Sequence, residues 1–196
     1  MKDSEFIRGN VPMTKEEVRV LTIERLALQH AGRFIDVGAG TGSVAIDAAL
    51  RYPSLEVLAI ERNPEAIDLI TLNCKKFSVS NVEIMQAYAP VALTGWEADA
   101  IFIGGSGGNL TDIIDWSHQQ LAAGGRLVLN FILLNNLTEA VGYLRQSRFC
   151  DINVCQLQVS HLTALGNGEY FKPNNPTYII SCYKSKESAD ASINCR

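Results

Sequence analysis

The chain has 196 residues, of which 47% are hydrophobic and 19% are charged, and its net charge is −4. This length suffices for one sizeable hydrophobic core, so we expect a single domain over residues 1–185 and a disordered polar tail over 186–196. No apolar run approaches the ~20 residues of a membrane-spanning helix and no signal-peptide pattern is present, so no membrane partner is expected. A mildly acidic chain without a basic run is also a poor partner for nucleic acid.

The cysteines lack the paired spacing of a metal site. Their number is odd and no Cys-x-x-Cys occurs, so we predict no metal site and no disulfide framework. Free thiols are typical of a reducing cytosol, and a cytoplasmic location is therefore expected. The five cysteines are Cys74, Cys150, Cys155, Cys182 and Cys195.

Short apolar runs alternate with stretches of helical periodicity along the chain. Helices are predicted over residues 14–30, 43–51, 64–77, 110–121 and 137–147. Strands are predicted over 33–37, 55–60, 81–86, 98–103, 126–131, 151–160 and 177–183, with a loop between the last two. This alternation favours a parallel sheet with helices on both faces, and two consecutive final strands predict an antiparallel edge. We therefore expect an α/β, Rossmann-like fold with a seven-stranded, mostly parallel sheet.

A glycine-rich turn follows the first predicted strand. The run Asp36-Val37-Gly38-Ala39-Gly40-Thr41-Gly42 has the form of a strand end, a tight turn and a helix start. Glycine adopts backbone angles that other residues avoid, and it lets a ligand lie against the main chain. The helix that follows is expected to offer unpaired N–H groups at its positive end, where a carboxylate or phosphate is favourable. The turn therefore predicts a ligand site.

Glu61 ends the second predicted strand, and an acid at this position predicts a ribose-binding site. A carboxylate there can accept hydrogen bonds from both ribose hydroxyls, although a solvated acid is the alternative interpretation. The glycine order Gly-x-Gly-x-Gly differs from the dinucleotide pattern Gly-x-Gly-x-x-Gly. With the run at 121–128 it resembles the class I S-adenosylmethionine-dependent methyltransferases, and that resemblance implies the class I methyltransferase fold. Nicotinamide binding is the alternative.

Three further segments, at residues 12–19, 89–90 and 104–110, narrow the resemblance. Together with the glycine turn and residues 61–66, they resemble the decarboxylating cobalt-precorrin-6B methyltransferases of cobalamin biosynthesis, over about residues 5–183. The resemblance implies transfer of a methyl group from S-adenosylmethionine to C-15 of the corrin macrocycle. It also implies loss of carbon dioxide from the acetate on C-12, which gives cobalt-precorrin-7 in the anaerobic pathway, and a homotetramer.

The same resemblance assigns residues to the cofactor. It implies contacts from Thr14, Gly38, Ala39, Gly40, Thr41, Gly42, Glu61 and Ala89. For Thr14 there is an equal alternative, because Thr14 and Glu17 have the spacing of a capping box, in which the hydroxyl only satisfies amides of the first helical turn.

The glycine loop after the fourth strand is expected to hold the acceptor, because ligands lie at the carboxyl ends of such strands. Its residues are Gly104, Gly105, Ser106, Gly107 and Gly108, and the alternative is a flexible loop without contacts. Asn130, at the end of the fifth strand, either binds the substrate or bonds only to its own backbone.

No residue is predicted to be catalytic, because methyl transfer depends mainly on alignment of donor and acceptor. Basic residues that could face a polyanionic tetrapyrrole are Arg8, Lys15, Arg19, Arg145 and Lys172, although each is better explained as a surface charge. His161 is interpreted as a structural histidine in a late strand.

Two other functions are compatible with the glycine turn and Glu61. A tRNA adenine methyltransferase has a similar catalytic domain, but it needs a basic face that this sequence does not show. A non-catalytic module that only binds S-adenosylmethionine is the second alternative, and the open glycine loop, which suggests a second substrate, argues against it.

Overall fold

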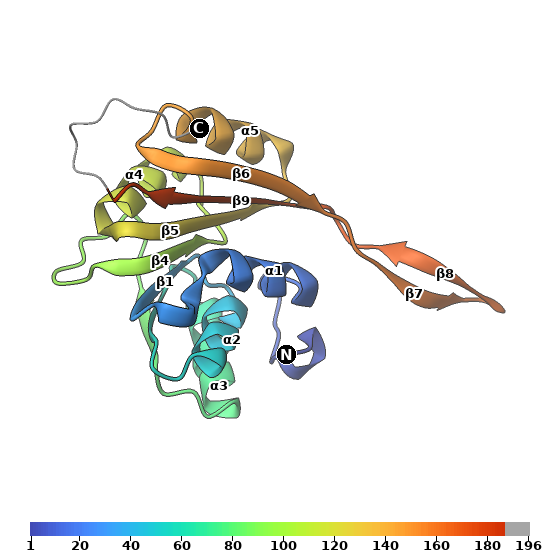
Figure 1. The fold of residues 1–196 in the computed structure, drawn as a ribbon. Coiled ribbons are helices and arrows are strands. Elements are labelled where there is room, and N and C mark those ends of the chain that lie inside the picture. Colours follow the sequence, from blue (N-terminus) through green and yellow to red (C-terminus); the bar gives the residue numbers. More distant parts are fainter. Residues whose placement is uncertain (187–196) are drawn as a thin grey trace.

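The computed structural model describes residues 1–186 and contains a seven-stranded sheet with the strand order β3-β2-β1-β4-β5-β9-β6 (Figure 1). The first five of these strands are parallel, and β9 runs antiparallel to both β5 and β6. The predicted fold is confirmed. The strands are β1 (Arg33–Val37), β2 (Glu56–Glu61), β3 (Val82–Gln86), β4 (Ala98–Ile103), β5 (Leu121–Phe131), β6 (Phe149–Leu157) and β9 (Thr177–Lys184).

Helices cover both faces of the sheet, as the sequence predicts. The hydrophobic cluster on one face includes residues of α1 (Glu16–Leu26), α2 (Ser43–Arg51) and α3 (Pro64–Lys76). The cluster on the other face includes residues of α4 (Leu110–Gln120) and α5 (Leu134–Leu144). Successive residues of one strand alternate between the two clusters, as the pleat requires.

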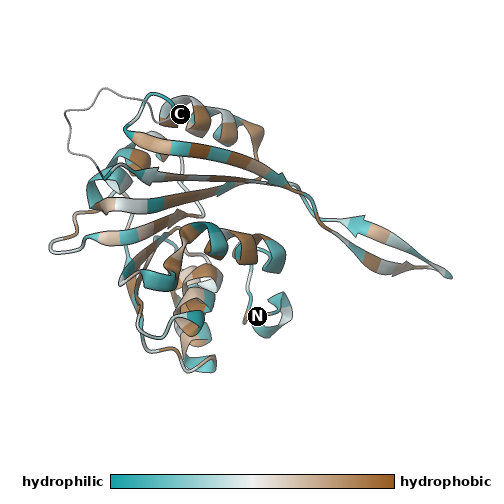
Figure 2. Ribbon diagram, in the orientation of Figure 1, coloured by the Kyte–Doolittle hydropathy of each residue, from teal (hydrophilic) through white to brown (hydrophobic). Residues whose placement is uncertain are grey.

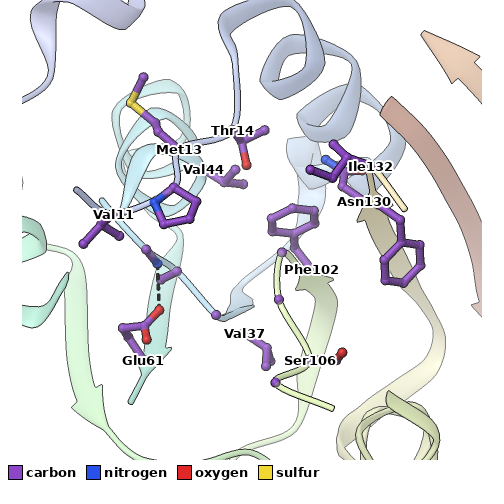
Figure 3. Close-up of a pocket in the computed structure, with 18 of the residues that line it drawn as sticks. Val11, Met13, Thr14, Val37, Val44, Glu61, Phe102, Ser106, Asn130 and Ile132 are labelled. Carbon is purple, nitrogen blue, oxygen red and sulfur yellow. Dashed lines mark hydrogen bonds between the residues drawn. The ribbon is translucent and has the colours of Figure 1, made fainter. Parts of the chain in front are cut away.

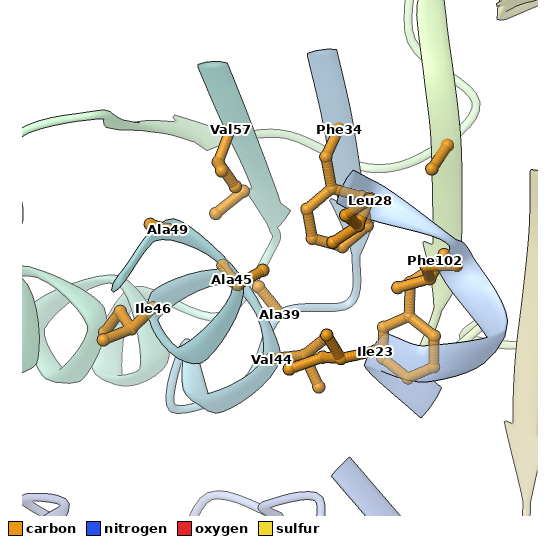
Figure 4. Packing of buried hydrophobic residues seen from close by; sticks show 14 of the residues in the cluster. Ile23, Leu28, Phe34, Ala39, Val44, Ala45, Ile46, Ala49, Val57 and Phe102 are labelled. Carbon is orange, nitrogen blue, oxygen red and sulfur yellow. The ribbon is translucent and has the colours of Figure 1, made fainter. Parts of the chain in front are cut away.

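Figure 4 shows the first cluster from close by. Phe34 of β1 and Phe102 of β4 pack in this cluster with Val44 and Ala45 of α2. Ile35, the next residue along β1, belongs to the cluster on the other face. Ala45, Ala48 and Ala49 of α2 contribute small side chains to this cluster.

The predicted helix 14–30 differs from the structure at both ends. α1 begins at Glu16, and its N-cap is Lys15 without a side-chain cap bond, so the predicted capping box of Thr14 and Glu17 is wrong. The helix ends where Ala27 adopts a left-handed conformation (φ 52°), and a separate 3₁₀ turn, η2, follows over Leu28–His30. The last predicted helix, over residues 137–147, is also shifted: α5 covers Leu134–Leu144.

The segment predicted as a loop between the last two strands forms a hairpin instead. Strands β7 (Ser160–Leu165) and β8 (Gly168–Pro173) pair only with each other, and this arm projects from the body of the protein (Figure 1). Its residues alternate weakly in hydropathy, and Figure 2 shows hydrophobic positions on both strands. His161 is exposed rather than structural, and its Nε2 lies 3.1 Å from Glu17 Oε1.

Three of the cysteines in the described residues agree with the prediction, and one does not. Cys74, Cys155 and Cys182 are free. Cys150 is disulfide-bonded, which contradicts the expectation of free thiols throughout. The tail predicted to be disordered covers 186–196, and its residues 187–196 lie outside the described residues. Within residues 1–186, no helix has the length and hydropathy to span a membrane, and no cluster of metal-ligating side chains is found.

Arg19 is fully buried on α1 and holds three segments together. Its Nε donates to Asp47 Oδ2 on α2 at 2.9 Å, and its Nη1 donates to Asp3 Oδ1 at 3.2 Å and to the Thr14 carbonyl at 2.8 Å. A further bond runs from Nη2 to the carbonyl of Met1. The guanidinium is therefore satisfied on all sides, which a buried charge requires. The sequence interpretation of Arg19 as a surface charge is wrong.

Asp36 is a second buried charged group, and it is poorly compensated. Its Oδ2 accepts a hydrogen bond from the Ala45 amide at 3.1 Å, while its Oδ1 has no partner in the described residues. Burial raises the pKa of the Asp36 carboxyl from 3.8 to about 7; the Ala45 hydrogen bond opposes this shift, and the negative charge of Glu61 adds to it.

Replacement of Arg19 by methionine is expected to lower the free energy of unfolding by about 3 kcal/mol or more, because the buried carboxylate of Asp47, together with Asp3 and two carbonyl groups, loses a charged donor. Urea unfolding followed by circular dichroism measures the change. Arg33→Met is the control, since the Arg33–Glu56 ion pair lies on the surface and its loss costs about 1 kcal/mol or less. Equal losses in the two variants would contradict the structural role of Arg19.

Asp36→Asn is expected to change how stability depends on pH. Because the folded protein holds this proton more tightly than the unfolded chain, stability contributed by wild-type Asp36 falls as pH rises from 3.8 to about 7. Asparagine does not titrate, so the variant gains stability relative to wild type between about pH 5 and about pH 8. Urea unfolding of both proteins at these two pH values measures the gain. An equal difference in stability between variant and wild type at both pH values would show that Asp36 is ionised in the folded protein throughout this range.

Candidate functional site

A cavity of about 670 Å³ opens at the carboxyl ends of the parallel strands. Its walls come from the N-terminal segment 11–15, the glycine turn 38–40, the loops after β2 and β3, the loop after β4, the end of β5 and residues 173–177 before β9. Figure 3 shows Thr14, Glu61, Ser106 and Asn130 around the same space. Segments far apart in the sequence thus meet at the edge where the sequence predicts a ligand site.

At two positions of the turn, neighbouring backbone leaves no room for a Cβ atom, so glycine is required there. A Cβ atom on Gly38 (φ +71°) would lie 2.7 Å from the Gly105 carbonyl oxygen, and one on Gly40 (φ +58°) would lie 2.7 Å from the Pro12 carbonyl oxygen. The turn is therefore in direct contact with the loop after β4 on one side and with the N-terminal segment on the other. Glycine is needed for these contacts as well as for any ligand.

The amides of the three glycines in the turn are used inside the protein, whereas the prediction of unpaired N–H groups concerns the start of the helix that follows. The Gly38 amide donates to the Ile60 carbonyl at 2.9 Å, and the Gly42 amide donates to the Ala39 carbonyl at 2.8 Å. The Gly40 amide donates to Glu61 Oε2 at 2.9 Å. A ligand at this turn therefore meets glycine Cα atoms and open space rather than a ring of donors.

Glu61 is held rigidly by main-chain donors. Figure 3 shows the bond from Gly40 as a dashed line. In addition, Oε1 of Glu61 accepts hydrogen bonds from the amides of Arg62 at 2.8 Å and Asn63 at 2.9 Å. An ionised carboxylate has about four acceptor positions, and the three main-chain bonds leave room on Oε2 for a further donor. A fixed acceptor beside the glycine turn suits a hydroxyl group and disfavours a phosphate.

Thr14 lies in the cavity wall beside the glycine turn. Its hydroxyl does not cap α1, and its carbonyl accepts a hydrogen bond from Arg19 Nη1. The capping alternative is therefore excluded, while contact with a cofactor remains a prediction. Ala89 is buried and also lines the cavity.

Three of the predicted ligand-binding residues do not line the cavity. A Cβ on Gly42 would face Ile46 and Ile70 in the core, and Thr41 is buried with no partner for its Oγ1 in the described residues. Gly108 lies beyond the part of its loop that faces the cavity. Gly104, Gly105, Ser106 and Gly107 do line the cavity, together with Gly38, Ala39 and Gly40.

Asn130 lines the cavity, and its amide nitrogen bonds to a side chain of α1 rather than to its own backbone. Its Nδ2 donates to Thr22 Oγ1 at 2.8 Å, and Thr22 in turn donates to the Val18 carbonyl at 2.8 Å. The Oδ1 atom has no partner in the described residues. Asn130 therefore connects β5 to α1 behind the cavity wall.

The sequence interpretation missed Arg62 and Tyr88, which both line the cavity. Arg62 directly follows β2, and Tyr88 follows β3 after one residue, so both lie at the same edge of the sheet as the glycine turn. This position at the carboxyl end of a parallel strand was the sequence signal that could have identified them. Of the predicted basic candidates only Lys15 lines the cavity, whereas Arg8, Arg145 and Lys172 do not.

Comparison with known proteins identifies the family. A family model for the precorrin methyltransferase domain matches residues 5–184. The cobalt-precorrin-6B C(15)-methyltransferase (decarboxylating) of Salmonella typhimurium is 54% identical over 187 residues, which cover 95% of this chain and 97% of the relative.

Solved structures agree with these matches. A precorrin-6y C5,15-methyltransferase from Geobacter metallireducens superposes with a TM-score of 0.88 at 37% identity, covering 94% of this chain and 96% of the other. A precorrin 8W decarboxylase from Methanobacterium thermoautotrophicum gives a TM-score of 0.85 at 35% identity, covering 93% and 98%. The chain therefore belongs to the precorrin methyltransferase family.

Proposed function

We propose that this protein transfers a methyl group from S-adenosylmethionine to C-15 of cobalt-precorrin-6B and removes carbon dioxide from the acetate side chain on C-12. The observation that carries the proposal is the direct contact between Gly38 of the glycine turn and Gly105 of the loop after β4. A donor held on the turn and an acceptor held on the loop would meet in one cavity, which is the arrangement that group transfer requires.

The cavity residues fit S-adenosylmethionine. Glu61 is fixed with one acceptor position left on Oε2, which can accept from a ribose hydroxyl, and the open glycine turn leaves space for the amino-acid end. Ala89 offers a small buried surface to the adenine. When bound, this cofactor supplies a methyl group on a sulfonium, which an electron-rich carbon can attack in line.

The acceptor side of the cavity suits a flat macrocycle. Phe102, Ile113, Phe131 and Ile132 give it apolar walls, and the glycines of the loop leave room beside them. The ring carbon acts as the nucleophile, so the residues need only align it and exclude water. Decarboxylation breaks the bond to an ionised carboxylate, sends the electron pair into the electron-poor ring, and leaves a carbon that takes up one proton. Methylation first, which creates this electron sink, is the order we favour.

Incubation with cobalt-precorrin-6B and labelled S-adenosylmethionine, followed by mass spectrometry, tests the function. The expected product has gained one methyl group and lost one carbon dioxide. Parallel titrations with tRNA separate the alternative of a tRNA adenine methyltransferase, which would bind tRNA tightly and leave the tetrapyrrole unchanged. A module that only binds the cofactor would bind S-adenosylhomocysteine and transfer nothing.

Glu61→Gln is expected to weaken S-adenosylhomocysteine binding by about ten-fold or more, because the neutral amide is a poorer acceptor for hydroxyl groups and for the Gly40 amide. Isothermal titration calorimetry measures the loss. Glu56→Gln, at the exposed opposite end of the same strand, is the control and should bind normally. Normal binding by both variants would exclude Glu61 from the cofactor site.

We also propose a homotetramer in the cytoplasm. The projecting arm exposes Leu162, Leu165, Tyr170 and Phe171, and apolar side chains gathered on one arm favour contact with other protein surfaces. The free thiols at Cys74, Cys155 and Cys182 favour a reducing compartment, with Cys150 as the exception.

Light scattering after size-exclusion chromatography is expected to give four times the chain mass of 21.5 kDa. Phe171→Glu should lower this mass, because a charge would be buried between subunits. Glu169→Gln on the same strand is the control. An unchanged mass for Phe171→Glu would exclude the arm from the interface.

A further inference from the structure

Arg62, Tyr88 and Gly107 form a junction between the two halves of the cavity. The Tyr88 hydroxyl donates to the Gly107 carbonyl oxygen at 3.0 Å, and the Arg62 guanidinium carbon lies 5.3 Å from the centre of the Tyr88 ring. All three residues line the cavity. The side chains that follow β2 and β3 are thereby attached to the glycine loop after β4.

Gly107 leaves room for the guanidinium against the main chain of this loop. A Cβ atom at Gly107 (φ +60°) would lie 2.8 Å from Arg62 Nη1, so any larger residue would displace the guanidinium or the loop. The aromatic ring of Tyr88 supports the cation from another side. Because the planar guanidinium is already positioned, it loses less freedom when it binds a ligand.

The charge of Arg62 has no acidic partner among the described residues. Lys15 is the other cation among the residues that line the cavity, and its Nζ lies 3.6 Å from Asp3 Oδ2. Glu61 is next to Arg62 in sequence, but its carboxylate accepts from main-chain amides. An unpaired guanidinium in a cavity wall is suited to bind a carboxylate with two parallel hydrogen bonds.

We propose that Arg62 binds a carboxylate side chain of the acceptor and so fixes how the acceptor lies against the glycine loop. This inference rests on the proposed function, because it needs an acceptor that carries carboxylates. Glu61 faces the glycine turn through the Gly40 amide, whereas the Arg62 guanidinium lies against Gly107 of the opposite loop. The two adjacent residues thus serve different halves of the cavity, and Arg62 determines acceptor specificity rather than cofactor affinity.

Steady-state kinetics with cobalt-precorrin-6B test the proposal on Arg62→Gln and Arg62→Lys. Loss of a charged, bidentate contact is expected to raise KM for the tetrapyrrole by about ten- to a hundred-fold in Arg62→Gln. The lysine variant should recover part of this loss, because it keeps the charge but not the paired geometry. The dissociation constant of S-adenosylhomocysteine, measured by calorimetry, should change by less than about three-fold.

Arg145→Gln is the matched control, because Arg145 lies at the end of α5 and does not line the cavity. Its KM should equal that of wild type. An unchanged KM in Arg62→Gln would overturn the proposal. Equal weakening of cofactor and tetrapyrrole binding would also overturn it, and would place Arg62 in the cofactor site.

A separate binding measurement distinguishes failure of this proposal from failure of the proposed function. If wild type does not convert cobalt-precorrin-6B, the proposed function fails. Uroporphyrin, a tetrapyrrole whose side chains end in carboxylates, then serves as a probe of Arg62 by quenching of tryptophan fluorescence. Weaker uroporphyrin binding by Arg62→Gln than by Arg145→Gln supports the carboxylate contact, and equal binding by the two variants overturns it.

Discussion

The buried guanidinium of Arg19 is the interaction on which the cavity depends. It joins α1 to α2 through Asp47 and reaches back to Asp3 and to the Thr14 carbonyl. Residues 11–15 form one wall of the cavity, and Arg19 bonds to their main chain at the Thr14 carbonyl while Val11 packs against Ala66 and Leu69 of α3. A buried charge is costly unless every polar neighbour is in place, so the same interaction that stabilises the domain also determines the path of the N-terminal segment.

The glycine turn depends on that path. Gly40 can approach the Pro12 carbonyl so closely because glycine has no Cβ atom, and Gly38 approaches the Gly105 carbonyl in the same way. The turn's own amides bond to the Ile60 carbonyl, to Glu61 and to Ala39. The shape of the ligand site is therefore set before any ligand binds, which reduces the entropy that binding has to overcome.

Local sequence patterns predicted much of the sheet but little of what holds the site together. β1, β4 and α2 follow the predicted bounds, because each is a buried run that ends at a glycine or a charged residue. Spacing alone could not decide between the two interpretations of Thr14, since Thr14 and Glu17 have the spacing of a capping box although Lys15 is the N-cap. Arg19 was expected at the surface, because its partners Asp3 and Asp47 are brought to it by tertiary packing alone. Arg62 was missed for the same reason, since its neighbours Tyr88 and Gly107 come from other strands.

The arm and the cavity are parts of one continuous stretch of backbone. Residues 173–177, which leave β8 and enter β9, line the cavity, and the Asn174 amide is bonded to the Val159 carbonyl at the base of the arm. A contact that moves the arm therefore also moves the cavity wall. In the homotetramer that we propose, subunit association through the arm would be linked to turnover, and the specific activity would then depend on the protein concentration.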